Sequence, residues 1–370
     1  MDPRLAGAYL TIDLAALQSN YKILTQIGGN TECAAVVKAD GYGLGASRVA
    51  PALAAAGCNK FFVALPDEAI HLRKILPQVE IFVLGGLFDD CATIYVQERL
   101  TPVLNTLDEI KTWSAMTATH GPLPAILHLD TGITRLGLME RDIRLLAATP
   151  QWLDGLEIEY IMSHLACADE PDNPQNQDQL DTLISLKELL PEALQNTPLS
   201  FANSSGMFLG KDYLFDLARP GIALYGGNPT PGAPNPMKPV VHLQGKILQI
   251  HDVDSQKPIG YGATYRTSGK ARIATVSVGY ADGYFRCLGN QAECAINNKK
   301  VPVVGRVSMD MISIDVTDVA VDKCKRGDLV SLIGGPIDIN RLAADAGTIS
   351  YEILTSLGPR YHRHYLDVNL

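Results

Sequence analysis

The first 225 or so residues alternate between short apolar runs and stretches with helical periodicity, and this alternation limits the folds open to the chain. The apolar runs are rich in Val, Ile, Leu and Phe, as expected for strands buried on both faces of a sheet. Repeated strand–helix units predict a parallel sheet, and about eight of them in this length are typical of an α/β fold, the closed (β/α)8 TIM barrel. An open doubly wound sheet is the alternative. The predicted strands are residues 34–38, 61–64, 79–84, 101–104, 125–130, 156–163, 199–203 and 222–225.

A break in composition divides the chain. Residues 226–239 read GGNPTPGAPNPMKP, which is too rich in Gly and Pro for a helix or a central strand. Beyond the break, strand-like runs at 240–253, 271–278, 292–296, 300–307 and 328–333 predict a mostly β C-terminal domain, with a tight turn at Asn297 and Asn298 and a helical stretch at 341–357. We expect an N-terminal strand within 1–11 that joins the β domain, a barrel over 12–232 and the β domain over 233–370.

Charge, cysteine usage and hydropathy exclude several classes of protein. The 40 acidic and 31 basic residues give a net charge of −9, which argues against a nucleic-acid partner. The N-terminus lacks the charged and apolar segments of a secretory signal, and the longest apolar runs are too short to cross a membrane. Seven cysteines without a C-x-x-C pair fit reduced thiols in the cytoplasm, and no metal-ligand spacing is convincing. The triplet at 362–364, HRH, is interpreted as a solvated tail segment.

Polar residues occur where predicted barrel strands end. The carboxyl ends of the strands form the active-site rim of such barrels, so several reactive or anion-binding residues there predict a catalytic barrel. Lys38 ends the first strand, Arg135 follows the fifth, His164 ends the sixth, Asn203 and Ser204 end the seventh, and Arg219, Pro220 and Gly221 lead into the eighth.

Lys38 closes the apolar run AAVVK and precedes ADGYG. Burial at a strand end disfavours the charged ammonium, which lowers the pKa of the amine and makes it nucleophilic. Such a lysine suits a Schiff base with an aldehyde or ketone. A lysine that extends from the strand end to water is the alternative, and position alone favours it.

The turns that begin at Asn203 and at Arg219 are candidates for a phosphate site. Loops after the last two strands of such barrels often bind phosphate through backbone N–H groups and a small hydroxyl. Ordinary turns have the same composition, so neither is decisive alone. Together with Lys38 they indicate a phosphorylated carbonyl cofactor or substrate.

Eight segments resemble the alanine racemase family of fold-type III pyridoxal-phosphate enzymes, in register from about Tyr9 to the end of the chain. Five lie in the barrel and three in the β domain, and such a series is more specific than any one motif. They are VKADGYG at 37–43, DTGITRLG at 130–137, SHLACAD at 163–169, ANSSG at 202–206, RPGIALYG at 219–226, GYGATY at 260–265, VGYADGY at 278–284 and GRVSMD at 305–310.

The resemblance implies pyridoxal 5'-phosphate joined to Lys38 and a homodimer in which each barrel faces the partner's β domain. Racemisation needs acid/base groups on opposite faces of the substrate, and by resemblance these are Lys38 and Tyr261 of the other subunit. Arg219 would face the pyridine nitrogen of the cofactor. Because arginine stays protonated, it can only donate there and leaves the ring a weaker electron sink.

The resemblance also implies positions for the remaining groups. Tyr42, Ser204, Gly221 and Ile222 would hold the phosphate, with His164 and Asn203 elsewhere in the cofactor site. Arg135 and the backbone of Met309 would receive the substrate carboxylate, and Tyr280 and Asp310 would line the entrance.

The chain departs from the family pattern at two positions. His128 stands where some members carry a carbamylated lysine, so a bound anion or His128 itself would have to orient Arg135. Pro359 aligns with a phosphate-binding tyrosine of other members.

These observations favour an enzyme that interconverts L-alanine and D-alanine by two-base proton transfer, either to supply peptidoglycan or to degrade D-alanine. A racemase of broader specificity, a decarboxylase of the same architecture and a non-catalytic pyridoxal-phosphate carrier are the alternatives. Decarboxylases of this architecture place a carboxylate at the pyridine nitrogen, and Arg219 at that position argues against this alternative. A carrier protein would leave the β domain unexplained.

Overall fold

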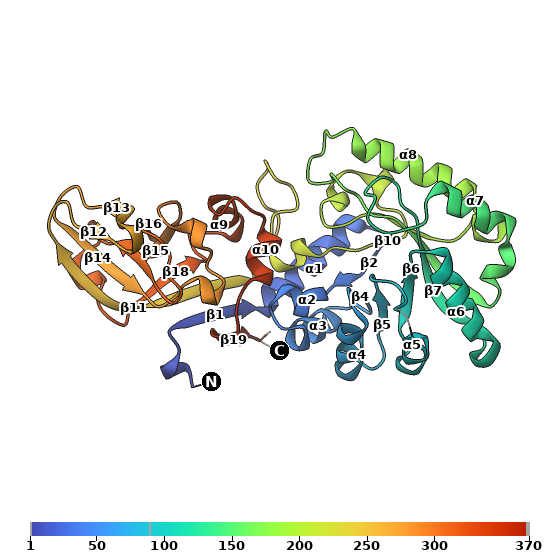
Figure 1. The fold of residues 1–370 in the computed structure, drawn as a ribbon, viewed down its shortest axis with the longest axis horizontal. Helices are drawn as coiled ribbons and strands as arrows, with labels where there is room; N and C mark the ends of the chain where they lie inside the picture. Colours follow the sequence, from blue (N-terminus) through green and yellow to red (C-terminus); the bar gives the residue numbers. More distant parts are fainter. Residues whose placement is uncertain (1, 89, 368–370) are drawn as a thin grey trace.

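The structure is a computed structural model that describes residues 2–88 and 90–367. Parallel strands β3 to β9 form one sheet in chain order, and β10 pairs in parallel with β2, the first half of the strand that continues as β3. Backbone bonds from Ala34 N to Ala218 O and from Arg219 N to Ala202 O, both 2.9 Å, close the sheet through β10. The (β/α)8 barrel is confirmed and the open sheet is excluded (Figure 1). The barrel strands are β2 (Glu32–Cys33), β3 (Ala35–Val36), β4 (Lys60–Val63), β5 (Glu80–Val83), β6 (Thr101–Leu104), β7 (Leu123–His128), β8 (Leu156–Met162), β9 (Leu199–Ser200) and β10 (Leu217–Ala218).

Helices between the strands surround the barrel, and local signals set where several of them begin. The Asp13 side chain accepts a hydrogen bond from Ala16 N at the start of α1, and Thr106 does the same for Glu109 N at the start of α6. These helices are α1 (Leu14–Gly28), α2 (Lys38–Tyr42), α3 (Ala46–Ala55), α4 (Pro66–Ile75), α5 (Ala92–Glu98), α6 (Leu107–His120), α7 (Glu140–Ala148) and α8 (Gln175–Glu188).

The prediction of the eighth strand at 222–225 is wrong. Those residues form the 3-10 turn η6 (Ile222–Tyr225), and the eighth strand is the two-residue β10 just before Arg219. All four residues of η6 are buried, and a short buried apolar run does not distinguish a strand from a helical turn. Arg219 therefore follows the eighth strand and lies at the carboxyl end of the barrel.

The second lobe is built on an eight-stranded sheet in the order β14-β17-β16-β15-β18-β11-β1-β19. The predicted turn is confirmed, since Asn297 and Asn298 have positive φ angles of 49° and 64° between antiparallel β15 and β16. The strands of this lobe are β1 (Ala8–Asp13), β11 (Val241–Val253), β12 (Pro258–Ile259), β13 (Tyr265–Arg266), β14 (Ala271–Val276), β15 (Glu293–Ile296), β16 (Lys299–Val304), β17 (Ile312–Asp315), β18 (Leu329–Ile333) and β19 (His362–Leu366).

Two predictions for the C-terminal part need correction. The helical stretch at 341–357 is two short helices, α9 (Ile339–Asp345) and α10 (Ser350–Thr355), separated by Gly347 with a φ of 70°. The triplet at 362–364 is not a solvated tail, because it forms the start of β19 and pairs in parallel with β1. The polar composition of the triplet did not predict a strand, because the side chains of β19 are partly or fully exposed.

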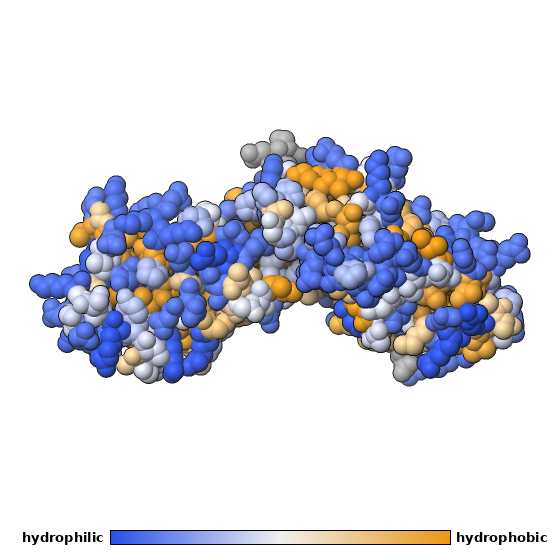
Figure 2. Space-filling model, turned by 90° about the horizontal axis from the view of Figure 1, so that it is seen from above, coloured by the Kyte–Doolittle hydropathy of each residue, from blue (hydrophilic) through white to orange (hydrophobic). Residues whose placement is uncertain are grey.

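The lobes are joined through β1, which pairs with β11 and β19 and leads directly into α1 of the barrel. Figure 1 shows an elongated molecule with the barrel at one end and β12 to β14 at the other. Figure 2, seen from above, shows two masses joined by a thinner middle part. The limits 1–11, 12–232 and 233–370 remain a prediction. In the described part of the chain, no helix has both the length and the apolar character needed to span a bilayer.

A charged cluster lies toward the end of the barrel opposite the strands' carboxyl ends. Lys60 Nζ lies 3.0 Å from Glu32 and 3.1 Å from Glu80. Glu159 Oε2 is buried with no hydrogen-bond partner in the described residues. Burial and the neighbouring Glu80 raise the pKa of Glu159 to about 7.

The raised pKa of Glu159 predicts a pH-dependent loss of stability. The folded chain holds this proton up to about pH 7, whereas an unfolded glutamate releases it near pH 4.3. Stability therefore falls as pH rises from about 4.5 to 7. Glu159→Gln is expected to be about 1 kcal/mol more stable than the parent at pH 8, after discounting for solvent, and equal to it near pH 4. Urea unfolding at both pH values measures this; Glu188→Gln, at an exposed position on α8, is the control. Equal gains at both pH values would contradict the titration.

Candidate active site

A cavity of about 350 Å³ lies at the carboxyl ends of the barrel strands. This is the edge at which the strand-end residues were expected to meet. Its lining includes these predicted site residues: Lys38, Tyr42, Arg135, His164, Asn203, Ser204, Arg219, Gly221 and Ile222. In the part of the chain that the structure describes, no group of three or more His, Cys, Asp or Glu side chains is arranged to hold a metal ion.

Lys38 is held at the cavity by a strained turn. It follows β3, and the next three residues, Ala39 to Gly41, all have left-handed backbone angles. Glu68 supports this turn, because its Oε1 accepts a 2.6 Å hydrogen bond from Ala39 N. Burial, with Arg135 nearby, lowers the pKa of the Lys38 amine, although Glu68 opposes the shift. A lysine with a lowered pKa is more often the free amine, which is the nucleophilic form.

Arg219 is a buried cation with neutral partners. The residue is 4% exposed, and it donates to Ser200 Oγ at 2.5 Å and to Ser163 O at 2.6 Å. Its Nη2 lies 3.3 Å from His164 Nδ1, and no carboxylate of the described residues pairs with it. Burial lowers the pKa of Arg219 to about 9. Burial also lowers the pKa of His164 well below its usual value, and the nearby charge of Arg219 adds to this shift. The site thus combines a cationic donor with a neutral imidazole.

One side of the cavity is a recess lined by hydroxyl groups. Ser204 Oγ accepts hydrogen bonds from Gly221 N at 2.9 Å and Ala223 N at 3.2 Å, which leaves its own hydrogen free to donate. A Cβ at Gly221 would lie 2.1 Å from Tyr42 Oη, so only glycine allows the tyrosine hydroxyl to approach this backbone. Hydroxyl and amide groups around a small space suit an anion such as phosphate.

Tyr351 is a site residue that the sequence analysis missed. It lies on α10, lines the cavity and has its ring centroid 6.0 Å from that of Tyr42. Pro359, which the sequence analysis aligned with a phosphate-binding tyrosine, does not line this cavity, whereas Tyr351 does. The tyrosine within the predicted helical stretch was the only available signal.

Arg135 is presented by a closed loop after β7. Asp130 Oδ1 accepts from Gly132 N and Thr134 N, both at 3.0 Å, and Leu138 N returns to His128 O at 2.8 Å. The Arg135 side chain is exposed at the cavity and forms no hydrogen bond or ion pair with the residues described. An uncommitted guanidinium at this place can bind a carboxylate.

Four predicted residues do not line this cavity: Tyr261, Tyr280, Met309 and Asp310. They belong to the second lobe, where Tyr261 is 72% exposed and Met309 is 53% exposed. Tyr261 begins the turn η7 (Tyr261–Ala263), separated from β12 by one residue, and β12 lies at the end of the molecule away from the barrel (Figure 1). One chain therefore does not bring Tyr261 to Lys38.

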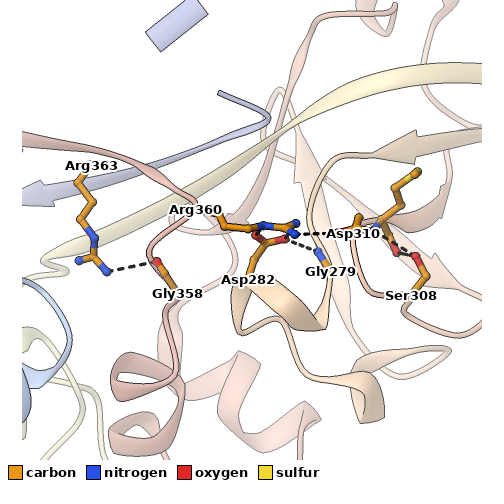
Figure 3. A network of polar contacts seen from close by, with 8 residues as sticks. Gly279, Asp282, Ser308, Asp310, Gly358, Arg360 and Arg363 are labelled. Atoms are coloured by element: carbon orange, nitrogen blue, oxygen red, sulfur yellow. Dashed lines mark hydrogen bonds and ion pairs between the residues drawn. The ribbon is translucent and has the colours of Figure 1, made fainter. Parts of the chain in front are cut away.

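A polar network holds the turn η8 (Tyr280–Asp282) against the loop that carries Met309 (Figure 3). Arg360 donates to Asp282 Oδ1 and to Asp310 Oδ1, both at 2.7 Å. Met309 O accepts from Ala281 N at 3.0 Å, whereas the Met309 amide makes no hydrogen bond within the described residues. The network therefore fixes the Met309 N–H group, which has no partner among the described residues, at the surface of this lobe. Asp310 belongs to the network as an ion-pair partner of Arg360.

If the Met309 amide receives a substrate carboxylate, as expected from the sequence, a weaker network should weaken substrate binding. Asp310→Asn removes one ionic arm of Arg360, so the Met309 loop is less well fixed. We expect the KM for the substrate to rise about fivefold, with kcat nearly unchanged and less than 1 kcal/mol lost in stability, because the pair is half exposed. Steady-state kinetics and thermal melting measure this, with exposed Asp322→Asn as the control. A fall in kcat at constant KM would contradict a positioning role.

The comparisons with known proteins agree over nearly the whole chain. The family model "Alanine racemase, N-terminal domain" matches residues 12–229, and "Alanine racemase, C-terminal domain" matches residues 240–365. A catabolic alanine racemase of Mesorhizobium japonicum is 47% identical over 98% of this chain and 94% of its own length. An alanine racemase of Rhodospirillum rubrum is 46% identical over 97% and 96%. The crystal structure of alanine racemase from Bartonella henselae with covalently bound pyridoxal phosphate has a TM-score of 0.93 and 42% identity, covering 98% of this chain and 100% of that one.

Proposed function

The chain belongs to the alanine racemase family, and we propose that it interconverts L-alanine and D-alanine with pyridoxal phosphate and two proton-transfer groups, Lys38 of one subunit and Tyr261 of another. The observation that carries this proposal is the cavity, where an amine with a lowered pKa, an unpaired guanidinium and a hydroxyl-lined recess meet. The reaction runs both ways. It would supply D-alanine to peptidoglycan or degrade it, according to which isomer is in excess.

The cavity fits pyridoxal phosphate by the chemistry of its groups. Ser204, Tyr42, Tyr351 and the backbone at Gly221 and Ile222 would hold the phosphate, because the Gly221 cradle is open only without a Cβ. Asn203 and His164 line the same cavity. When bound, the cofactor supplies an electron sink for charge at the α-carbon of an amino acid.

Arg219 favours racemisation over decarboxylation. A guanidinium with a pKa of about 9 is protonated at neutral pH and offers only N–H donors to a ring nitrogen. Such a donor would leave the ring nitrogen of the bound cofactor without a proton of its own, so the cofactor would supply only a moderate electron sink and fewer side reactions would follow. Release of carbon dioxide from an amino acid would instead favour the decarboxylase.

Lys38 can act on one face of the substrate only, so a second group is needed on the other face. His164 is neutral and already engaged by Arg219. An exposed tyrosine on a second copy of the chain is the group that we propose, and this makes the enzyme a homodimer with shared sites. The exposed side chains of Tyr261, Tyr280 and Met309 support such a contact, since tyrosine and methionine are enriched in the buried cores of protein interfaces.

The substrate carboxylate would bind between the lobes of two subunits. Arg135 offers an uncommitted guanidinium from the barrel, and the partner's loop offers the unused amide of Met309. Tyr280 and Asp310 would lie along the way in. All seven cysteines are free, in keeping with a proposed cytoplasmic location.

The deciding experiment measures D-alanine formed from L-alanine by the purified protein with pyridoxal phosphate. Racemisation of alanine in both directions supports the proposal, and much slower reaction of serine and larger amino acids supports alanine as the substrate. Cofactor binding without turnover of any amino acid would favour the carrier and refute the racemase.

A further inference from the structure

His128, the last residue of β7, lines the barrel cavity but has no part in the proposed function so far. It is 6% exposed. Its Nδ1 lies 2.7 Å from Asn105 Oδ1, whereas its Nε2 is buried with no hydrogen-bond partner among the described residues. A buried polar atom without a partner costs free energy, so its presence beside a cavity points to a group that it is built to receive.

Asn105 determines which hydrogen-bonding role that nitrogen has. Asn105 Nδ2 donates to Val103 O at 2.8 Å, so Oδ1 is the acceptor that faces His128. His128 Nδ1 must then carry the hydrogen, and Nε2 has a lone pair. Glu109 fixes Asn105 in turn, since its Oε2 accepts from Asn105 N at 2.5 Å. Burial and the nearby Arg219 lower the pKa of His128 to about 3, which keeps the ring neutral.

A lone pair fixed in this way selects a donor and rejects an anion. A chloride or carboxylate would be repelled by the Nε2 lone pair, because both are hydrogen-bond acceptors and neither carries a hydrogen to share. The cationic donors that line the cavity are Lys38, Arg135 and Arg219. Arg219 already donates to Ser163 and Ser200, contacts His164 and is proposed to face the cofactor ring, and Lys38 is the proposed nucleophile.

Arg135 remains as the donor, and its charge acts on His128 electrostatically. Its loop is joined to β7 by the hydrogen bond from Leu138 N to His128 O. Neither His128 Nε2 nor the Arg135 guanidinium has a hydrogen-bond partner among the described residues. We infer that in the holoenzyme Asn105 and His128 form an orienting pair whose Nε2 accepts an N–H of Arg135 and turns the opposite edge of the guanidinium toward the substrate carboxylate. Arg135 then needs no bound anion to hold it. This inference rests on the proposed function of Arg135 and makes His128 a positioning residue.

The first test reads the tautomer directly, independently of turnover. Holoenzyme labelled with ¹⁵N-histidine is compared with Asn105→Leu by NMR between pH 5 and 8. We expect His128 to be neutral throughout, with hydrogen on Nδ1 and an unprotonated Nε2, and we expect the preference to weaken in the variant. A parent with hydrogen on Nε2, or a ring that becomes charged in this range, overturns the inference even if the enzyme is a racemase.

The second test separates orientation from folding. His128→Phe removes the acceptor but keeps a planar ring, whereas the amide oxygen of His128→Gln can still accept. Loss of a hydrogen bond to a charged group predicts about a tenfold rise in KM for both isomers in the first variant, with kcat within about threefold and most of the loss recovered in the second. Cofactor absorbance and melting temperature check folding, with the exposed His120→Phe as control. An unchanged KM in His128→Phe overturns the inference.

The dependence of activity on chloride tests the remaining alternative, in which a bound anion orients Arg135. Parent activity is measured from zero to 0.2 M chloride at constant ionic strength. We expect it to change by less than about twofold, because His128 already supplies the acceptor. A requirement for chloride would assign the orientation of Arg135 to a bound anion and overturn the inference. If the parent forms no D-alanine, the proposed function fails, and the tautomer measurement still decides whether the Asn105–His128 pair exists.

Discussion

Lys38→Ala is expected to lower alanine racemisation by at least about a thousandfold, to a level near that of free cofactor. The variant loses both the amine that would hold the cofactor and one of the two proton-transfer groups. It should also lose the absorbance band of covalently attached pyridoxal phosphate. The cofactor-free variant should melt at the temperature of the cofactor-free parent, because the Lys38 side chain is half-buried and makes no hydrogen bond to the described residues.

Two controls separate these effects. Lys38→Arg keeps the charge but not a nucleophilic amine, so it should be as inactive as Lys38→Ala. The exposed Lys211→Ala should behave as the parent. If Lys38→Ala retains a tenth or more of the parent's activity with the cofactor still covalently attached, another residue holds the cofactor and the assignment of Lys38 is wrong.

The barrel was predictable because most of its strands are apolar runs separated by helix-length segments. The eighth strand was not, because β10 has only two residues and the buried run that follows it forms η6. The error put Arg219 before the strand. The structure puts it after β10, and this is why its guanidinium reaches Ser163, Ser200 and His164 at the carboxyl edge.

The barrel half of the site was predictable for the same reason, since its residues follow strands. Tyr351 was not, because α10 follows all but the last strand of the β domain in the sequence and only the folded chain brings it against α2. The role of His128 was left open because the state of its two nitrogens depends on Asn105, more than 20 residues away and directly after the neighbouring strand β6.

The second-lobe residues had no signature other than family resemblance. A site completed by another subunit leaves only exposed side chains and an unused amide in a single chain, and the structure has both at Tyr261 and Met309. Shared sites therefore need a test that involves two chains.

Tyr261→Phe is expected to slow racemisation by at least about a thousandfold while leaving exchange of the α-proton with solvent for one isomer only. The L and D forms have equal free energies, so kcat/KM must fall equally in both directions. Proton removal need not be symmetric. Lys38 still serves the face that it reaches, whereas phenylalanine cannot accept a proton on the other. NMR of each pure isomer in D₂O measures this, with the neighbouring Tyr265→Phe as control. Loss of exchange from both isomers, or its retention in both, would contradict the two-base assignment.

Mixing the two inactive variants tests whether the site is shared. When Lys38→Ala and Tyr261→Phe chains are unfolded and refolded together, half of the dimers are hybrids. In each hybrid one site carries both substitutions and the other carries neither, because Lys38 of one chain meets Tyr261 of the other. Activity should therefore return to about a quarter of the parent's. A site contained within one chain would be damaged in every subunit, so no activity would return, and the proposal of a shared site would fail while that of a racemase stood.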